Sequence, residues 1–243
     1  GKEACRYAQE QQGSLVENLV SLAREGKPVN LEGQDFHPIA LLALFIKRSL
    51  STLSGVTSLD KVEGIMFTSD CLDKNMVDVL GQVVGRLGLK TKNICFQGYV
   101  ESIYYYMISQ PEELWRYQVL VCDYNDDGMR VYRMECNNKT NPVVAFIEDE
   151  KYSFNPVQNL PMEEGLLEEE KVARDAEFLE ILQETSKERT ISSVYLIGEG
   201  FAGDWMKDSL RFICKNRRVF QGSNLYSKGA CYTMREKQGA SEI

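Results

Sequence analysis

The order of strand-like and helical segments after Pro111 constrains the fold of this chain more than any other feature of its sequence. Three strand-like runs, "YQVLVCDY", "GMRVYRMEC" and "NPVVAFIED", follow one another with no helix between them. A helix expected over 163–187, a strand at 194–197 and two further helices with a short strand between them come next. Strands joined by short connections favour antiparallel pairing, whereas strands separated by helices favour parallel pairing. We therefore predict an α/β lobe whose sheet combines both directions.

The long helix begins in an acidic run, which suits the positive end of a helix dipole. Its apolar residues recur at helical spacing and predict one buried face, formed by Val172, Ala176, Leu179 and Leu182.

The first half of the chain shows a shorter alternation. Helices are expected over 13–25, ending at Gly26, and after Pro38. A strand over 62–69, a helix marked by Met76, Leu80, Val83 and Leu87, the short strand "KNICF" and the helix "ESIYYYMIS" follow. This β-α-β-α order matches only the end of the pattern in the second half. We predict an incomplete first lobe over 1–113 and a second lobe over 114–243. Because the chain begins at Gly1 and not Met, we expect an N-terminally truncated fragment whose missing start supplies three strands.

Charge and cysteine content limit the classes of partner. The net charge of -8 and the pI near 5.0 argue against a nucleic-acid backbone or an anionic membrane surface as the main partner. No apolar run approaches the roughly 18 residues of a membrane span, and no signal peptide is evident. Seven cysteines without a CxxC pair indicate reduced thiols and a cytoplasmic location.

Two short segments carry the candidate chemistry. The strand "VYLI" ends at Gly198-Glu199-Gly200, and glycines at a strand end let another molecule approach the backbone closely. The same pattern also suits a tight strand-to-helix corner. In "DYNDDG", Asp127-Gly128 supplies hairpin turn residues. Asp123, Asn125, Asp127 and Gly128 match the start of a calcium-binding loop, but Met134 occupies its last ligand position and the flanks read as strands. The question left open is whether this hairpin faces phosphate or Mg²⁺.

His37 is the only histidine in the chain and precedes Pro38 at a predicted helix start. With no second histidine there is no metal cluster to build, and we expect His37 to cap the helix.

Four segments of the chain resemble the actin-like ATPase superfamily, which includes actin, the sugar kinases and the seventy-kilodalton heat-shock chaperones. "VLVCDYNDDGMRVYRM" (119–134) resembles the second phosphate loop, and "VYLIGEGFAGDWMKDSL" (194–210) resembles the adenosine motif. "ICFQGYVESIYYYM" (94–107) resembles a connecting segment, and "NLYSKGACYTM" (224–234) resembles the chaperones' last helix. The order and spacing agree over roughly 34–236. The chain also resembles bacterial proteins of a family of unknown function. The resemblance implies two ribonuclease-H-like lobes, of which the first is incomplete here.

The resemblance also implies a nucleotide site. It places the following residues at ATP and Mg²⁺, with Asp123 as the candidate metal ligand: Asp123, Asn125, Asp127, Gly128, Gly198, Glu199, Gly200 and Phe201. The chain departs from the family pattern at three points. Asn125, Asp126 and Asp127 replace phosphate-binding glycines, Gln97 replaces an acidic residue, and the first phosphate loop is absent from this chain. Extra carboxylates repel a triphosphate unless a metal ion lies between them.

These departures favour a non-catalytic interaction or scaffold module whose partner is another protein or a second copy of the chain. The alternative is an ATP- and Mg²⁺-binding ATPase whose lobe closure drives a partner or polymer. Tightly filled space beside Gly198 favours the first hypothesis, and an open cleft favours the second. A sugar or acetate kinase ranks last, because no residue here is assigned as its acidic base.

Overall fold

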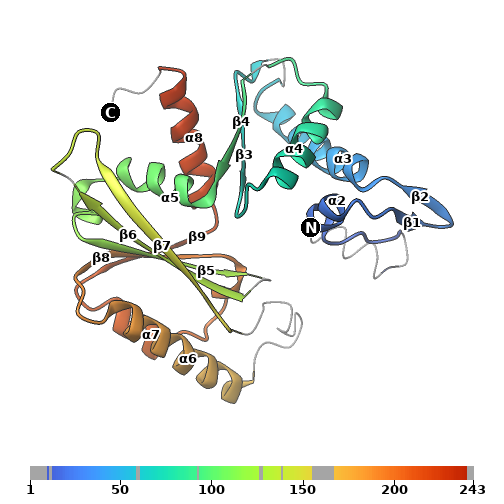
Figure 1. Ribbon diagram of the computed structural model, residues 1–243. Coiled ribbons are helices and arrows are strands. Elements are labelled where there is room, and N and C mark those ends of the chain that lie inside the picture. The colour runs from blue at the N-terminus through green and yellow to red at the C-terminus, as the bar shows by residue number, and fades with distance from the viewer. Residues whose placement is uncertain are drawn as a thin grey trace. The chain divides into compact units, whose positions relative to one another are not determined.

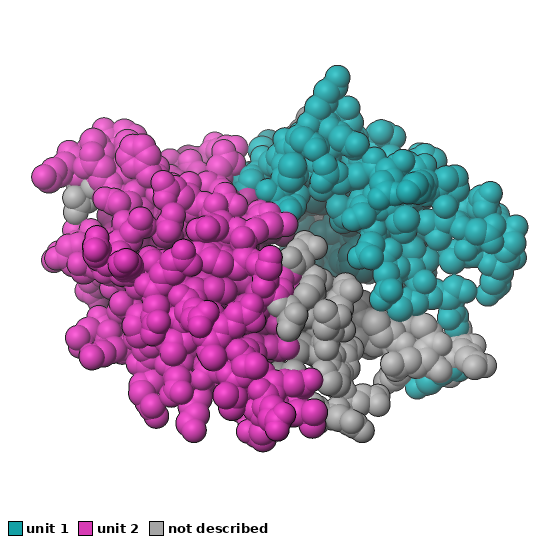
Figure 2. Space-filling view, turned by 60° about the horizontal axis from the view of Figure 1, so that its bottom comes forward, with its two compact units in different colours: residues 1–98 teal, residues 99–243 magenta. Residues whose placement is uncertain are grey.

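The computed structural model describes residues 10, 13–58, 61–91, 93–125, 128–137, 139–154 and 167–239. The chain divides into two compact units, residues 1–98 and 99–243 (Figure 2). The division falls earlier than the predicted lobe boundary at 113/114, because the helix over Tyr99–Ile108 packs on the last helix of the second unit. No helix in the described part of the chain is long and apolar enough to cross a membrane.

The described part of the first unit contains three α-helices and two small sheets. The helices are α2 (Leu19–Glu25), α3 (Pro38–Ser51) and α4 (Lys74–Leu87), and a 3₁₀ helix, η1, covers Thr52–Gly55. β1 (Val29–Leu31) and β2 (Gln34–Phe36) form an antiparallel hairpin, and β3 (Ile65–Ser69) pairs in parallel with β4 (Ile94–Gly98). Ala23, Ile39, Leu42, Val79 and Val83 are among the buried residues between the helices.

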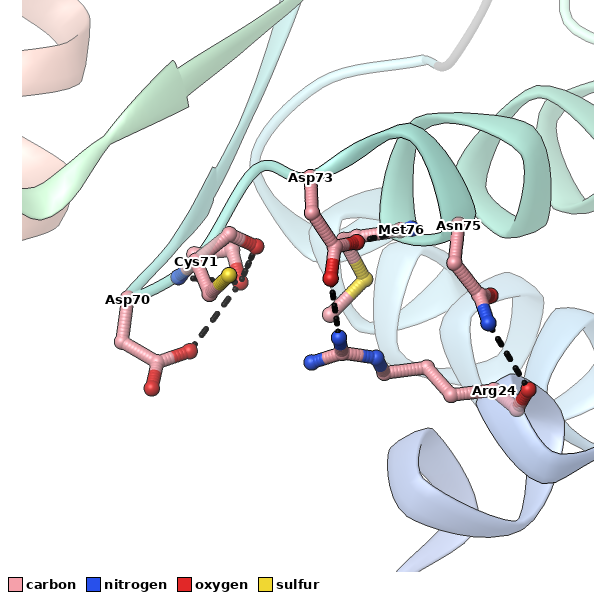
Figure 3. Close-up of polar contacts among 7 residues, drawn as sticks. Arg24, Asp70, Cys71, Asp73, Asn75 and Met76 are labelled. Atoms are coloured by element: carbon pink, nitrogen blue, oxygen red, sulfur yellow. Dashed lines mark hydrogen bonds and ion pairs between the residues drawn. The ribbon is translucent and has the colours of Figure 1, made fainter.

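Polar side chains fix the helix starts of this unit. His37 Nδ1 accepts a hydrogen bond from the Ile39 amide at 3.3 Å, which confirms the predicted capping role. Asp73 caps α4 by accepting from the Met76 amide at 2.8 Å, and its carboxylate lies 2.5 Å from an Arg24 guanidinium nitrogen (Figure 3). Asp73 therefore both starts α4 and ties it to α2.

The second unit is built on a five-stranded sheet in the order β7-β6-β5-β8-β9 (Figure 1). The strands are β5 (Gln118–Asn125), β6 (Gly128–Asn137), β7 (Val144–Tyr152), β8 (Ile191–Ile197) and β9 (Arg218–Gly222). β5, β6 and β7 are antiparallel neighbours, whereas β8 runs parallel to both β5 and β9. The predicted α/β class with a sheet of mixed direction is confirmed.

Helices cover both faces of this sheet (Figure 1). α6 (Glu168–Ser186) and α7 (Asp208–Ile213) lie on one face, and α5 (Tyr99–Ile108) and α8 (Leu225–Lys237) lie on the other. Because side chains alternate along a strand, Leu120, Cys122 and Tyr124 of β5 face α6 and α7. Val119 and Val121 face α5 and α8. The central strand β5 is therefore buried from both sides.

Some expectations about elements need correction. The predicted apolar face of α6 is wrong except at Leu182, since Val172 is 67% exposed and the buried face carries Phe178, Ile181 and Leu182. The helix predicted over 13–25 begins only at Leu19, and the β1–β2 hairpin was not predicted. The expected start of α6 at 163 lies outside the described residues.

Candidate functional site at the carboxyl ends of β5 and β8

The two candidate segments meet at one edge of the five-stranded sheet. β5 and β8 are parallel neighbours, with Asp123 opposite Ile197, so their carboxyl ends lie side by side. After β5 the chain turns back into β6, whereas after β8 it passes through η5 (Glu199–Phe201) and α7 to β9 on the other side. In open α/β sheets, ligands bind at points where the connections diverge in this way. The edge is therefore the strongest candidate site.

The glycine turn after β8 packs directly on Tyr124, near the end of β5. Gly198 has φ of +100°, and a Cβ there would lie 2.8 Å from the Tyr124 carbonyl carbon and closer still to its oxygen. A Cβ at Gly200 would lie 2.6 Å from Tyr124 Cε1 and closer to other atoms of the ring. Both glycines thus allow the close approach of this chain's own backbone and side chain. The space beside Gly198 is filled.

Tyr124 belongs to a buried aromatic cluster formed by Tyr124, Phe154, Phe178, Phe201 and Trp205. Phe201 has no exposed surface, so its ring lies in the core of this unit and not beside an open nucleoside pocket. Trp205 Nε1 donates to the Gly200 carbonyl at 3.0 Å and holds the turn against the cluster. Among the four predicted residues of this turn, Glu199 is the exposed one.

Asp123 faces the opposite side of the sheet and is 6% exposed. Its Oδ2 accepts a hydrogen bond from the Tyr226 hydroxyl at 2.6 Å, and its Oδ1 accepts from Asn125 Nδ2 at 3.0 Å. Burial raises the pKa of Tyr226, and the charge of Asp123 raises it further. Tyr226 therefore remains a protonated donor, and its ring also stacks on Tyr99 at 3.8 Å. This arrangement connects β5 to α8.

The described donor atoms at this edge do not by themselves make up a magnesium site. Mg²⁺ requires an octahedron of oxygen ligands, usually with one or two carboxylates, but both oxygens of Asp123 accept hydrogen bonds from Tyr226 and Asn125. No three His, Cys, Asp or Glu side chains in the described ranges gather closely enough to hold a metal ion. Gly128 has φ of +96°, and a Cβ at this position would lie 3.1 Å from the Phe154 carbonyl oxygen. Asp127 lies outside the described residues.

Sequence reasoning missed the side chains that complete this site. Tyr226 lies far from Asp123 in the chain, and the segment 224–234 that contains it was matched to a helix and not to the nucleotide site. Tyr124 reads as one more apolar strand residue, although the alternation along β5 places it on the face of the glycine turn. Arg174 in α6 joins the aromatic cluster, with its guanidinium carbon 5.9 Å from the centroids of both the Tyr124 and Trp205 rings.

The first unit has a separate groove of about 560 Å³ beside α2 and α4, with Ile39 and Val79 among its lining residues. Its charged residues, Arg24, Lys74 and Asp78, are of both signs. Arg24 forms an ion pair with Asp73, and its backbone carbonyl accepts a hydrogen bond from Asn75 Nδ2 (Figure 3). These contacts join α2 to α4, so we interpret this region as a helix junction.

The fold and the site define a mixed α/β domain in which the crevice between two parallel strand ends is filled by the chain itself. Over residues 1–243 the chain matches the family described as "Family of unknown function (DUF5716) C-terminal", and it belongs to that family. A comparison with curated proteins found no match.

Proposed function

We propose that this domain is a divergent member of the actin-like ATPase superfamily that acts as an interaction or scaffold module and does not turn over nucleotide. The observation that carries the proposal is the occupation of the crevice by Tyr124, against which Gly198 and Gly200 pack. The hydrogen bonds of Asp123 to Tyr226 and Asn125 support it, because they occupy the carboxylate that the resemblance assigns to Mg²⁺.

The order of elements supports the kinship with this superfamily. The second unit runs β5-β6-β7-α6-β8-α7-β9-α8, which is the order expected of a ribonuclease-H-like lobe. The segment that resembles the connecting segment forms β4 and most of α5, and the segment that resembles the last helix lies in α8, which packs on α5. The glycine turn and the β5–β6 hairpin lie at the same edge. We propose that the ancestral crevice has become a structural junction in a cytoplasmic protein.

Isothermal titration of the chain with Mg²⁺ and ATP tests the proposal. We expect no saturable heat, because Tyr124 fills the space that a nucleoside would need. Glu199→Ala is the matched probe, since Glu199 is exposed and its loss should leave the fold intact. A saturable isotherm that Glu199→Ala weakens, with an unchanged circular dichroism spectrum, would refute the proposal. Light scattering of the same samples then separates self-association from a need for a different protein partner.

An ATP- and Mg²⁺-binding ATPase is the second candidate. The meeting of the hairpin and the glycine turn at a diverging sheet edge favours it. The matched family is described as C-terminal, and under this candidate we propose that a first phosphate loop lies upstream of it. The same titration on a longer chain that includes the upstream region distinguishes the two candidates.

A further inference from the structure

The aromatic cluster beside the glycine turn encloses a cation. Arg174 of α6 is 8% exposed, and its guanidinium lies over the rings of both Tyr124 and Trp205. Its Nη1 is buried without a hydrogen-bond partner, and no ion pair involves Arg174 in the described part of the chain. Arginine keeps its proton in proteins. Among the residues that the structure describes, a full positive charge is therefore buried here without a counter-charge.

The described acidic side chains nearest to Arg174 in the chain and at the turn have other partners or are exposed. Asp175 accepts from the backbone amides of Asp208 and Ser209 and from the Ser209 hydroxyl, so it caps α7. Asp204 and Glu168 both pair with Lys171, at 3.0 Å each. Glu177, on the next turn of α6, is exposed. Cation–π contacts with aromatic rings stabilise a buried charge by less than its removal from water destabilises it. A purely structural role therefore explains Arg174 poorly.

We propose that Arg174 binds an oxyanion, a phosphoryl or carboxylate group of a ligand, at the carboxyl ends of β5 and β8. The guanidinium fork matches both groups in a bidentate manner. Trp205 contacts Arg174 and also donates to the Gly200 carbonyl, so the cation is coupled to the turn at the diverging strand ends. Because Nη1 has no exposed surface, the anion reaches it only when a covering side chain shifts. The proposal does not depend on whether the domain binds ATP.

Thermal unfolding of the whole chain with three probes, at constant ionic strength, tests the proposal. The probes are sodium pyrophosphate, Mg²⁺ with ATP, and sodium citrate, against sodium chloride as the reference. We expect at least one probe to raise the melting temperature and to bind on the order of 30-fold or more weakly to Arg174→Met. Arg211→Met is the matched control, since Arg211 is an exposed arginine paired with Asp208. It should respond to the probes as the unchanged protein does.

The pattern of responses identifies the ligand chemistry. Stabilisation by pyrophosphate but not citrate assigns a phosphoryl group, the reverse assigns a carboxylate, and stabilisation by ATP alone assigns a nucleotide. Each of these supports the proposal if it disappears in Arg174→Met.

The melting temperature without any probe gives an independent readout. Methionine retains the apolar stem and removes the unpaired charge, so Arg174→Met should melt about 2–4 °C above the unchanged protein. An equal or lower melting temperature of Arg174→Met overturns the proposal, because it shows that the cation serves the fold. The absence of a response to all three probes overturns it as well.

Discussion

Tyr124 and Gly198 show how one residue determines what another position can be. Gly198 adopts φ of +100° and ψ of 159°, a conformation that is essentially limited to glycine, and it also lies against the backbone of Tyr124. Gly203 has a similar φ of +93°, but no atom lies within 4 Å of its hypothetical Cβ. A side chain at Gly203 would therefore meet backbone strain alone, whereas a side chain at Gly198 would meet both backbone strain and steric overlap.

We expect Gly198→Ala to lower the free energy of unfolding by about 1–3 kcal/mol more than Gly203→Ala. Both substitutions carry the strain of a positive φ, about 1–3 kcal/mol, and only the first forces a methyl group into Tyr124. Urea unfolding of both variants measures the difference. Equal losses would show that the contact with Tyr124 relaxes at little cost, which would weaken the interpretation of a filled crevice.

At the scale of elements, the crossing of α5 and α8 depends on a single small residue. A Cβ at Gly229 would lie 2.7 Å from the carbonyl carbon of Ser102, and both residues are buried. Around this point Ile103 and Met107 of α5 and Leu225 of α8 pack on β5 and β8. Close contact of the two helix backbones is what brings these side chains to the sheet.

Alanine substitutions in two helices should therefore have opposite signs. Gly229→Ala should destabilise the protein by about 1–3 kcal/mol through overpacking at the α5–α8 crossing. Gly85→Ala in α4 should stabilise it by about 0.5–1 kcal/mol, because its Cβ meets nothing within 4 Å and alanine favours the helix. Chemical denaturation gives both values. A stabilising Gly229→Ala would mean that α5 and α8 are less closely packed than described.

At the scale of the whole molecule, the second unit has the features of an independently folding domain. Its sheet has a core on each face, and α5 supplies side chains to one of them, including Ile103 and Met107 with no exposed surface. A boundary after Gly98 keeps that core intact, whereas a boundary after residue 113 removes α5.

A chain of residues 99–243 should therefore unfold cooperatively on its own, and a chain of residues 114–243 should not. Loss of each large buried side chain costs about 2–5 kcal/mol. Loss of two or more of them therefore removes a large part of a typical net stability of about 5–15 kcal/mol. Thermal melts followed by near-ultraviolet circular dichroism compare the two chains. Equal, cooperative melts would place α5 outside the folding unit.

The sequence predicted most elements of both units, because short-range periodicity reports secondary structure directly. It predicted α3 and α4, the antiparallel run β5–β7, and the His37 cap. It failed where apolar spacing was ambiguous: α6 has several possible stripes, and the one chosen contained the exposed Val172. The buried face of α6 is selected by the aromatic cluster, which combines residues from β5, α6 and the turn after β8.

By itself the sequence determined the α/β class, the antiparallel pairing of β5 with β6 and the glycine turn at 198, since each is encoded within a few neighbouring residues. Only the tertiary structure decided which groups pack against those glycines and which donors bind Asp123. It also decided that Arg174 is buried with no counter-charge among the described residues. These properties arise from pairs such as Asp123 and Tyr226, which are distant in the chain and adjacent in space. Their contact depends on strand order and helix packing, and no local pattern of residue types encodes it.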